Sequence, residues 1–240
     1  MFRNLFKKID GFTTHGKDIG PEEKFFSNVV GYQDIKKLLL KSVVAKEPVH
    51  ILLTGPPSSS KTVFLLEMQQ GLHDAYFIDA VNSSKAGIID HLFKYNTSYL
   101  LIDEIDKMKN TEQAALLNIM ETGILSETKL NGKTRQKKIK LWIFATSNKA
   151  EKISQPLRSR FMELELEEYT YEEFMEIVRR ILDKKYHTNA TFSAKIAHEV
   201  WHSLRSRDIR DAIRIAKLAA SPEDVEWLVQ VQRKYGKTRL

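Results

Sequence analysis

The sequence predicts an α/β protein in which a mostly parallel sheet is sandwiched by helices and is followed by a small all-α domain. Short apolar runs at 50–54, 75–80, 98–102 and 141–146 alternate with stretches of helical periodicity. This alternation is typical of parallel sheets with helices on both faces. After Phe161 the apolar runs stop and only helical patterns remain. The change of pattern predicts a second, helical domain.

The N-terminal part begins without a regular pattern. Residues 1–25 mix Lys, Gly and Thr around a few Phe, which predicts an arm. Residues 34–44 place apolar side chains at helical spacing with lysines between them, so an amphipathic helix is expected. The strand at 50–54 runs into Gly-Pro-Pro and then into a predicted helix at 60–70. Further helices are expected at 86–95 and 111–122.

Helical patterns define the C-terminal part. They cover the ranges 170–186, 191–204, 207–220 and 222–234. The hinge is expected near residues 165–170. The expected organisation is therefore an N-terminal arm at 1–25, an α/β domain at 26–167 and a helical domain at 168–240.

Composition limits the class of protein. With 240 residues and 42% hydrophobic content, the chain can bury the cores of one medium and one small domain. There is no cysteine and no apolar run near the length of a membrane span, so we expect a cytoplasmic protein with no membrane partner. The formal net charge of +7 favours an anionic partner such as nucleic acid, but it is also common in ordinary soluble proteins.

Residues 55–62 (GPPSSSKT) lie between a predicted strand and a predicted helix, which is the context of a phosphate-binding loop. Such a loop needs backbone N–H groups around the phosphates, a lysine that reaches them and a hydroxyl that holds Mg²⁺. Lys61 and Thr62 supply the last two groups. The general motif has a second glycine where this chain has Ser60, so weaker binding remains open. The alternative is a serine-rich turn that happens to precede Lys-Thr.

Two adjacent carboxylates, Asp103 and Glu104, follow the predicted strand at 98–102. In a parallel sheet, ligands collect at the carboxyl ends of the strands. We expect Asp103 to hold Mg²⁺, directly or through water, and Glu104 to orient and deprotonate the attacking water. An ordinary acidic strand end is the alternative, but it does not predict a phosphate-binding loop upstream.

Over roughly residues 25–220 the sequence resembles the AAA+ ATPases, with residues 55–62 similar to their Walker A motif and residues 100–106 (LLIDEID) similar to their Walker B motif. The resemblance implies a P-loop NTPase fold with a helical lid, and ATP with Mg²⁺ as cofactors. It implies that Thr62 and Asp103 hold the metal. The implied ATP contacts of the loop are Gly55, Pro56, Pro57, Ser58, Ser59, Ser60, Lys61, Thr62 and Val63.

Two segments resemble motifs that complete hydrolysis in this family. Residues 143–148 (IFATSN) resemble the sensor 1 strand, which implies that Asn148 contacts the γ-phosphate or the attacking water. Residues 156–161 (PLRSRF) match the arginine-finger segment of clamp loaders and RuvB-type helicases. The resemblance implies that Arg160, with Arg158 as the other candidate, reaches the ATP of the neighbouring subunit.

Two more segments complete the resemblance. Residues 207–212 (RDIRDA) resemble the sensor 2 helix of the lid, which implies that Arg210 contacts the phosphates. Residues 28–32 (NVVGY) resemble the stretch that packs on adenine, and Val30 is assigned to it. Taken alone, Asn148 could cap a turn and the arginines could be ordinary solvated or paired charges.

An arginine supplied by a neighbour implies that hydrolysis needs assembly. The resemblance therefore implies a ring of identical subunits, expected to be a hexamer. It also implies that hydrolysis shifts the lid relative to the α/β domain, since sensor 2 and the Walker motifs hold the same nucleotide.

Residues 124–140 predict a basic hairpin or long loop before the sensor 1 strand. Asn131-Gly132 is a tight-turn signal. The charge suits a DNA phosphate backbone, especially within 129–140, although an ordinary solvated hairpin explains it equally well. The basic residues are Lys129, Lys133, Arg135, Lys137, Lys138 and Lys140.

Three functions remain open at this point. The first, favoured by the resemblance to RuvB-type and clamp-loader ATPases, is a motor acting on DNA, as a helicase or translocase. The chain ends at Leu240, without the winged-helix domain that the RuvB family carries after its lid, so Holliday-junction specificity is not expected. The second is a MoxR-like remodelling ATPase with a protein client, although residues 80–95 hold no clear aromatic pore-loop motif. The third is a slow ATP-dependent switch or scaffold, for which Ser60 is the only indication.

Overall fold

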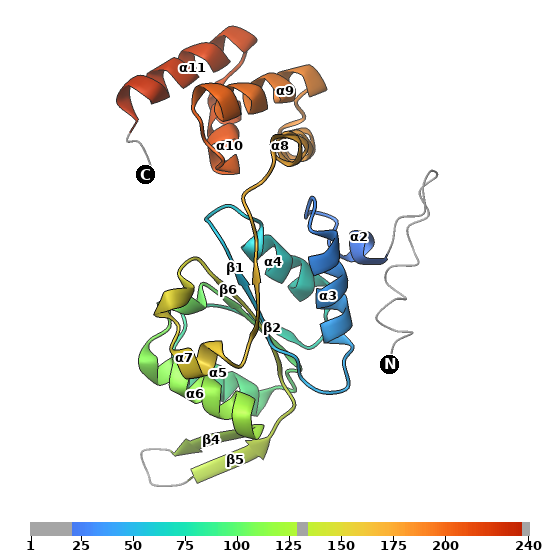
Figure 1. Cartoon of the computed structure of the whole chain (residues 1–240), viewed down its shortest axis with the longest axis vertical. Coiled ribbons are helices and arrows are strands. Elements are labelled where there is room, and N and C mark those ends of the chain that lie inside the picture. The colour runs from blue at the N-terminus through green and yellow to red at the C-terminus, as the bar shows by residue number, and fades with distance from the viewer. Residues whose placement is uncertain (1–20, 129–133, 237–240) are drawn as a thin grey trace. The chain divides into compact units, whose positions relative to one another are not determined.

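The computed structural model describes residues 21–128 and 134–236. The chain divides into two compact units, which we describe separately (Figure 1). The first contains the residues up to Gly55 together with Ser60–Leu166. The second contains Pro56–Ser59 and the residues from Glu167 onwards.

The first unit is built on a five-stranded sheet with the strand order β2-β3-β6-β1-β7. All its neighbouring strands are parallel, which confirms the predicted sheet. The strands are β1 (Ile51–Thr54), β2 (Ala75–Asp79), β3 (Tyr99–Asp103), β6 (Trp142–Ser147) and β7 (Met162–Glu165).

The edge strand β7 was not among the predicted strands. Its sequence, MELE, holds two glutamates in four residues, and most of it is exposed. An edge strand with one solvated face lacks the apolar run by which the four central strands were recognised. Its pairing with β1 is nevertheless regular, from Ile51 opposite Met162 to Thr54 opposite Glu165.

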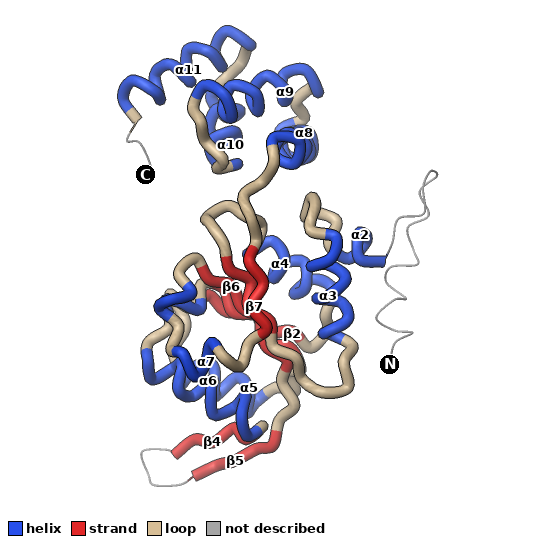
Figure 2. Tube along the Cα trace, in the orientation of Figure 1, coloured by secondary structure: helices blue, strands red, loops and turns tan. Residues whose placement is uncertain are grey.

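Helices cover both faces of this sheet (Figure 2). Helices α2 (Pro21–Phe25), α3 (Gln33–Val43) and α4 (Lys61–Gly71) lie on one face. Helices α5 (Lys85–Lys94), α6 (Asn110–Thr122) and α7 (Gln155–Arg158) lie on the other. Two short 3₁₀ turns, η1 (Ile105–Lys107) and η2 (Ala150–Lys152), follow β3 and β6. The helices expected in this part are thus present, within one or two residues of their predicted ends.

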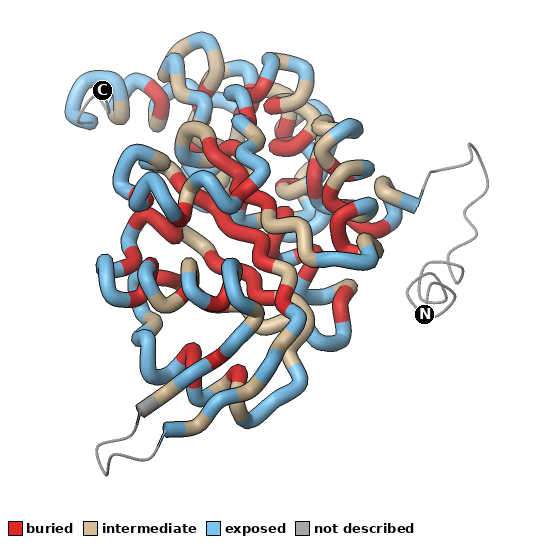
Figure 3. Tube along the Cα trace, turned by 60° about the horizontal axis from the view of Figure 1, so that its bottom comes forward, coloured by how far each residue is buried: buried red, intermediate tan, exposed pale blue. Residues whose placement is uncertain are grey.

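Two apolar cores form because successive strand residues point to opposite faces. Ile51 and Leu53 pack with Phe26 and Phe64 on the α3 and α4 face. Leu52 belongs to the core on the α5 and α6 face, together with Leu100, Ile102 and Ile143. The central strands are therefore covered on both sides, and all four residues of β1 are buried; Figure 3 colours the buried parts of the chain red.

The arm expected over residues 1–25 overlaps helix α2, so that part of the prediction is wrong. Phe25 and Phe26 are buried in the first core, and their rings pack edge to face. A helix of five residues is too short to display a period, so it escaped the sequence pattern. The first twenty residues of the expected arm lie outside the described residues.

The predicted hairpin is confirmed. Strands β4 (Ile124–Thr128) and β5 (Thr134–Lys138) form an antiparallel pair that runs from Ile124 opposite Lys138 to Thr128 opposite Thr134. The expected Asn131-Gly132 turn, with Lys129 and Lys133, lies outside the described residues.

The second unit contains the expected helices. They are α8 (Tyr171–Tyr186), α9 (Ala190–His198), α10 (Ile209–Leu218) and α11 (Pro222–Tyr235). The helix predicted at 191–204 changes to a π-helical turn, η3 (Glu199–Ser203), after His198. Capping boxes at Thr170 and Ser221 set the starts of α8 and α11. Among the described residues, no helix is long and apolar enough to cross a membrane.

Candidate nucleotide-binding site

The loop after β1 begins at Gly55, whose backbone has a φ of +137°. A Cβ atom placed there would lie 2.3 Å from the carbonyl oxygen of Leu166, which follows β7. The amide of Leu166 in turn donates to the carbonyl of Thr54 at 2.8 Å. The chain can leave β1 in this direction only because residue 55 has no side chain.

Helix α4 begins after Ser60, which has a left-handed backbone conformation with φ 60° and ψ 3°. Glycine adopts this conformation freely, whereas an L-residue with a side chain loses about 1–2 kcal/mol there. Ser60 therefore takes the backbone shape for which the general motif uses glycine. The loop keeps its direction, and the cost of serine in place of glycine is backbone strain at residue 60.

The residues between Gly55 and Ser60 hold the loop by local contacts. Ser59 is buried, and its Oγ donates to the carbonyl of Pro56 at 2.8 Å. Ser58 also has a positive φ, of 69°, and its Oγ donates to Asp208 Oδ1 at 2.9 Å within the second unit. Pro57 is exposed.

Lys61 is the first residue of α4 and is 6% exposed. Its Nζ donates to the carbonyl of Gly55 at 2.8 Å. Burial lowers the pKa of this ammonium from 10.5 to about 8, and the charges of Asp103, Asp106 and Glu104 oppose that shift. A lysine at a helix N-terminus is suited to bind phosphate oxygens.

Thr62 and Asp103 lie in contact at the start of α4 and the end of β3. Thr62 Oγ1 is 3.0 Å from both carboxylate oxygens of Asp103. A hydroxyl beside a carboxylate fits Mg²⁺, which commonly takes one or two protein ligands and completes its shell with water and phosphate oxygens. The described residues hold no cluster of three or more His, Cys, Asp or Glu side chains that could bind a metal by themselves.

The sequence analysis missed Thr146, which joins the two carboxylate residues. Its Oγ1 donates to Asp103 Oδ1 at 2.5 Å and accepts the backbone N–H of Glu104 at 3.0 Å. Thr146 is buried near the end of β6, next to β3. The sequence clue to Thr146 was a hydroxyl side chain two positions before Asn148, on the strand next to the one that ends at Asp103.

Glu104 and Asn148 are brought together by the same two strand ends. Asn148 Nδ2 donates to Glu104 Oε1 at 3.1 Å. Glu104 has a left-handed backbone, with φ 54°. The carboxylate is thus held beside an amide that can also bind water or phosphate oxygen.

Asp106, which hydrogen-bonds to the backbone of Asn148, was also missed. It is 5% exposed, and its Oδ1 accepts the Ser147 hydroxyl at 3.0 Å and the Asn148 backbone N–H at 3.3 Å. Asp106 is the third acid of LLIDEID, so a sequence signal for it existed.

The two candidate arginine fingers have partners on neighbouring elements of their own chain. Arg158 makes a bidentate pair with Glu163 of β7, with both N–O distances at 2.7 Å, and this pair raises the pKa of Arg158. Arg160 pairs with Glu121 near the end of α6. Both arginines belong to the half-exposed surface around α7, where such pairs exchange readily with other anions.

The remaining predicted contacts lie at three places. Val63 is half-buried in the first turn of α4, and Val30 is half-buried beside buried Val29. Arg210 is exposed in the first turn of α10, in the second unit, where its backbone N–H donates to Asp208 Oδ1 at 2.9 Å.

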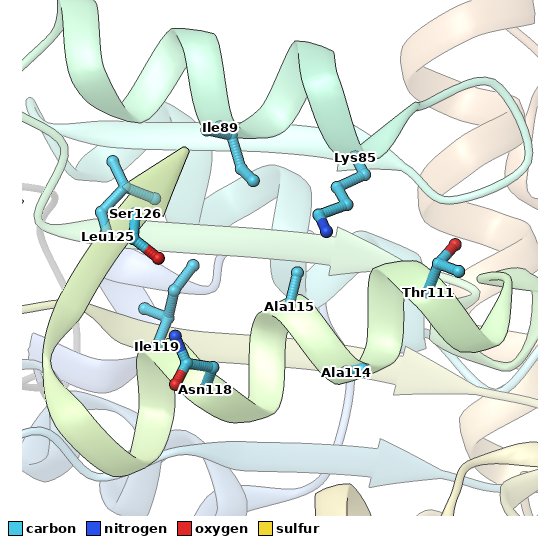
Figure 4. Close-up of a pocket in the computed structure, with 9 residues that line it drawn as sticks. All are labelled: Lys85, Ile89, Thr111, Ala114, Ala115, Asn118, Ile119, Leu125 and Ser126. Atoms are coloured by element: carbon cyan, nitrogen blue, oxygen red, sulfur yellow. The ribbon is translucent and has the colours of Figure 1, made fainter. Parts of the chain in front are cut away.

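A cavity of about 230 Å³ lies elsewhere in the first unit, between α5, α6 and β4 (Figure 4). Ile89, Ala115 and Ile119 form its apolar wall, and Lys85 and Asn118 lie at its rim. None of the predicted site residues lines it.

The basic hairpin is fastened to α5 by two of its cations. Arg135 bonds Asp90 on α5 at 2.8 Å and Glu127 on β4 at 2.6 Å, and its guanidinium lies 4.0 Å from the centre of the Phe93 ring. Lys137 Nζ donates to carbonyls at the end of α5, those of Leu92 at 3.1 Å and Tyr95 at 3.4 Å.

Comparison with known proteins agrees with this geometry. Residues 51–168 match the family model described as ATPase family associated with various cellular activities (AAA). The chain is 30% identical over 164 residues to the Holliday junction branch migration complex subunit RuvB of Pseudothermotoga lettingae, a match that covers 63% of this chain and 48% of the relative. It thus spans about half the length of that relative.

Solved structures of Thermotoga maritima RuvB share the fold. A RuvB mutant aligns with a TM-score of 0.67 and 21% identity over 88% of this chain and 73% of the other. RuvB described as a Holliday junction branch migration motor aligns with a TM-score of 0.61 and 21% identity, over 84% and 70% of the two chains. Residues 51–168 thus match the AAA family of ATPases, and the chain resembles RuvB in sequence and shares its fold.

Proposed function

We propose that this chain binds Mg-ATP and hydrolyses it as one subunit of a homo-oligomeric ring, expected to be a hexamer, that remodels DNA or a protein–DNA complex. The observation that carries the hydrolytic part is the joined cluster at the ends of β1, β3 and β6. There Lys61 and the Thr62–Asp103 contact lie beside the Glu104–Asn148 pair. These are the groups that phosphoryl transfer to water requires.

In this proposal the residues around the phosphates divide the work. The backbone of residues 55–62 and the Lys61 ammonium bind the phosphates, and Thr62 with Asp103 holds Mg²⁺. Bound Mg²⁺ would neutralise charge on the phosphate oxygens. Glu104 accepts a proton from the attacking water, and Asn148 orients Glu104 or that water.

Other assigned residues act from further away. Residues 26–167 would form the nucleotide-binding domain and residues 168–240 the lid, with Arg210 contacting phosphates from the lid. Val30 and Val63 would contact the nucleotide from the α3 and α4 side. Arg160, or Arg158, would leave its intramolecular partner and stabilise charge at the neighbouring subunit's ATP.

DNA is the first candidate substrate because a relative named for Holliday junction branch migration matches much of this chain. A protein client is the second candidate, and the hairpin favours it. Arg135 and Lys137 are engaged with α5, so the described part of the hairpin offers less free positive charge than its sequence suggested. A slow switch is less supported, since Ser60 keeps the backbone shape of glycine.

The test is steady-state turnover of ATP by the wild-type protein and by Glu104→Gln. The amide cannot accept the proton, so we expect turnover to fall about 100-fold or more while Mg-ATP binding stays within about twofold. Nucleotide binding by a fluorescent ATP analogue serves as the control for folding. Turnover near the wild-type value in the Glu104→Gln protein would exclude Glu104 as the base.

A further inference from the structure

Gln113 is a buried amide on α6, with 1% of its surface exposed. Its Nε2 donates to the carbonyl of Met108 at 3.1 Å and to the carbonyl of Lys152 at 3.4 Å. Its Oε1 accepts the backbone N–H of Ser154 at 2.8 Å. Both ends of the amide are therefore used, and all three partners are backbone groups.

These partners belong to two segments with different proposed tasks. Met108 follows η1 directly, and η1, which contains Asp106, begins immediately after Glu104. Lys152 and Ser154 lie between Asn148 and α7. The carbonyl of Ser154 accepts the backbone N–H of Arg158 at 2.9 Å, so the helix of Arg158 starts at a residue that Gln113 holds.

Buried polar groups join the segment that follows β3 to the segment between β6 and α7 at two points. Asp106 binds Ser147 and Asn148 at one point, and Gln113 binds Lys152 and Ser154 at the other. The apolar side chains of Ile105, Met108, Ile153 and Leu157, which flank the bonded groups in sequence, belong to one core and are at most 5% exposed. Without the amide, a backbone donor and two backbone acceptors would lose partners in an apolar environment.

We propose that Gln113 is a positioning residue that holds the arginine-bearing segment, residues 154–160, at a set position relative to Glu104 and Asn148 of the same subunit. The role rests on the proposed function, in which that segment serves the neighbouring subunit's ATP. The amide is suited to it because it offers a donor and an acceptor together, whereas Glu offers acceptors alone and Met offers only a weak sulfur acceptor. In each subunit, Gln113 thereby connects the catalytic residues Glu104 and Asn148 to the arginine that the same subunit places at its neighbour's ATP.

The test uses mixed assemblies of two full-length variants. Lender subunits carry Glu104→Gln and keep their arginines, and receiver subunits carry Arg158→Ala with Arg160→Ala and keep Glu104. Turnover in the mixture, absent from either variant alone, reports arginines acting between subunits. Gln113→Met is then introduced into the lender or into the receiver, and Gln113→Glu, which keeps an acceptor for Ser154 but sets a carboxylate oxygen against the two carbonyls, provides a second disruptive change.

We expect Gln113→Met in the lender to lower the turnover of the mixture about tenfold or more, because small misplacement of a charge-stabilising group is costly. The same change in the receiver should lower it less than about threefold. Gln113→Glu in the lender should give at least as large a loss, because its carboxylate would face two backbone carbonyls in an apolar environment. Exposed Gln70 on α4, changed to Met in the lender, is the matched control and should leave turnover unaltered.

A purely structural role would lower turnover equally in lender and receiver, and that result would overturn the inference. Amide hydrogen exchange in the Gln113→Met protein supplies a second reading, expected to rise over residues 153–161 while β6 stays protected. Unchanged exchange there would also overturn it. If the mixture without a Gln113 substitution gives no turnover, the proposal that an arginine of one subunit acts on its neighbour's ATP is wrong. The positioning role of Gln113 is then wrong as well.

Discussion

Lys61 combines burial with charge, and this combination makes nucleotide binding depend on pH. Burial lowers the pKa of its ammonium to about 8, below the ordinary 10.5. Phosphate oxygens favour the charged form, so bound nucleotide raises this pKa again. At pH values above 8, binding must therefore be accompanied by uptake of a proton.

We expect the affinity for ATP to be nearly constant below pH 8 and to fall above it, by up to about tenfold per pH unit. Calorimetric titration at pH 7 and pH 9, in two buffers of different ionisation enthalpy, measures both the affinity and the proton uptake. Lys61→Arg is the matched control, because arginine keeps its charge over this range. Equal pH dependence in both proteins would assign the effect to another group.

The sequence pattern identified the candidate site residues that belong to motifs. It missed the buried polar residues that hydrogen-bond to those residues or to the segments that carry them. Lys61, Thr62, Asp103, Glu104 and Asn148 stand at positions where a pattern of spacing exists. The structure joins four of these five in the pairs Thr62–Asp103 and Asn148–Glu104. Thr146, Asp106 and Gln113 are polar residues whose importance comes from burial and from partners on other elements, which spacing along one chain does not report.

At the scale of elements, the β4–β5 hairpin shows how side chains that alternate along a charged strand form two different faces. Arg135 and Lys137 are turned toward α5, whereas Thr134, Gln136 and Lys138 are exposed. The two inward cations bind a carboxylate, an aromatic ring and helix-end carbonyls. The inner face thus attaches the hairpin to α5, and the outer face is exposed.

Arg135→Gln and Lys138→Gln each remove one positive charge, but we expect different results. Loss of Arg135 removes the bonds to Asp90 and Glu127, so hydrogen exchange across β4 and β5 should rise while β6 stays protected. Lys138→Gln should leave that exchange as in the wild type, because its side chain is exposed. Exchange mapped by mass spectrometry on the full-length proteins measures both. Unchanged exchange in Arg135→Gln would show that its contacts do not hold the hairpin.

At the scale of the whole molecule, an arginine that acts on the neighbouring subunit's ATP makes ATP turnover depend on assembly of the subunits. We expect turnover per subunit to rise with protein concentration and to rise further with duplex or branched DNA. Binding of DNA should weaken steeply with salt, because neutralised phosphates release counterions. Loss of Lys138 should reduce the slope of that salt dependence by about one if this residue contacts phosphate.

Steady-state turnover over a concentration series, with each DNA and at two or more salt concentrations, measures these effects. Glu104→Gln at each condition gives the background. Turnover that is indifferent to DNA at every salt concentration would contradict the DNA proposal and favour a protein client. Turnover independent of protein concentration across the range of assembly would contradict the need for a neighbouring arginine.

The sequence by itself determined the class of fold and the central strands and indicated the candidate motif residues, because each leaves a local signal. Buried strands need continuous apolar runs, helices need a period, and phosphate loops need small residues before Lys-Thr. The tertiary structure decided the edge strand β7, the division of hairpin charge and the bonds of Thr146, Asp106 and Gln113. These depend on which distant segments meet in the folded chain, and that is set by packing rather than by any local pattern.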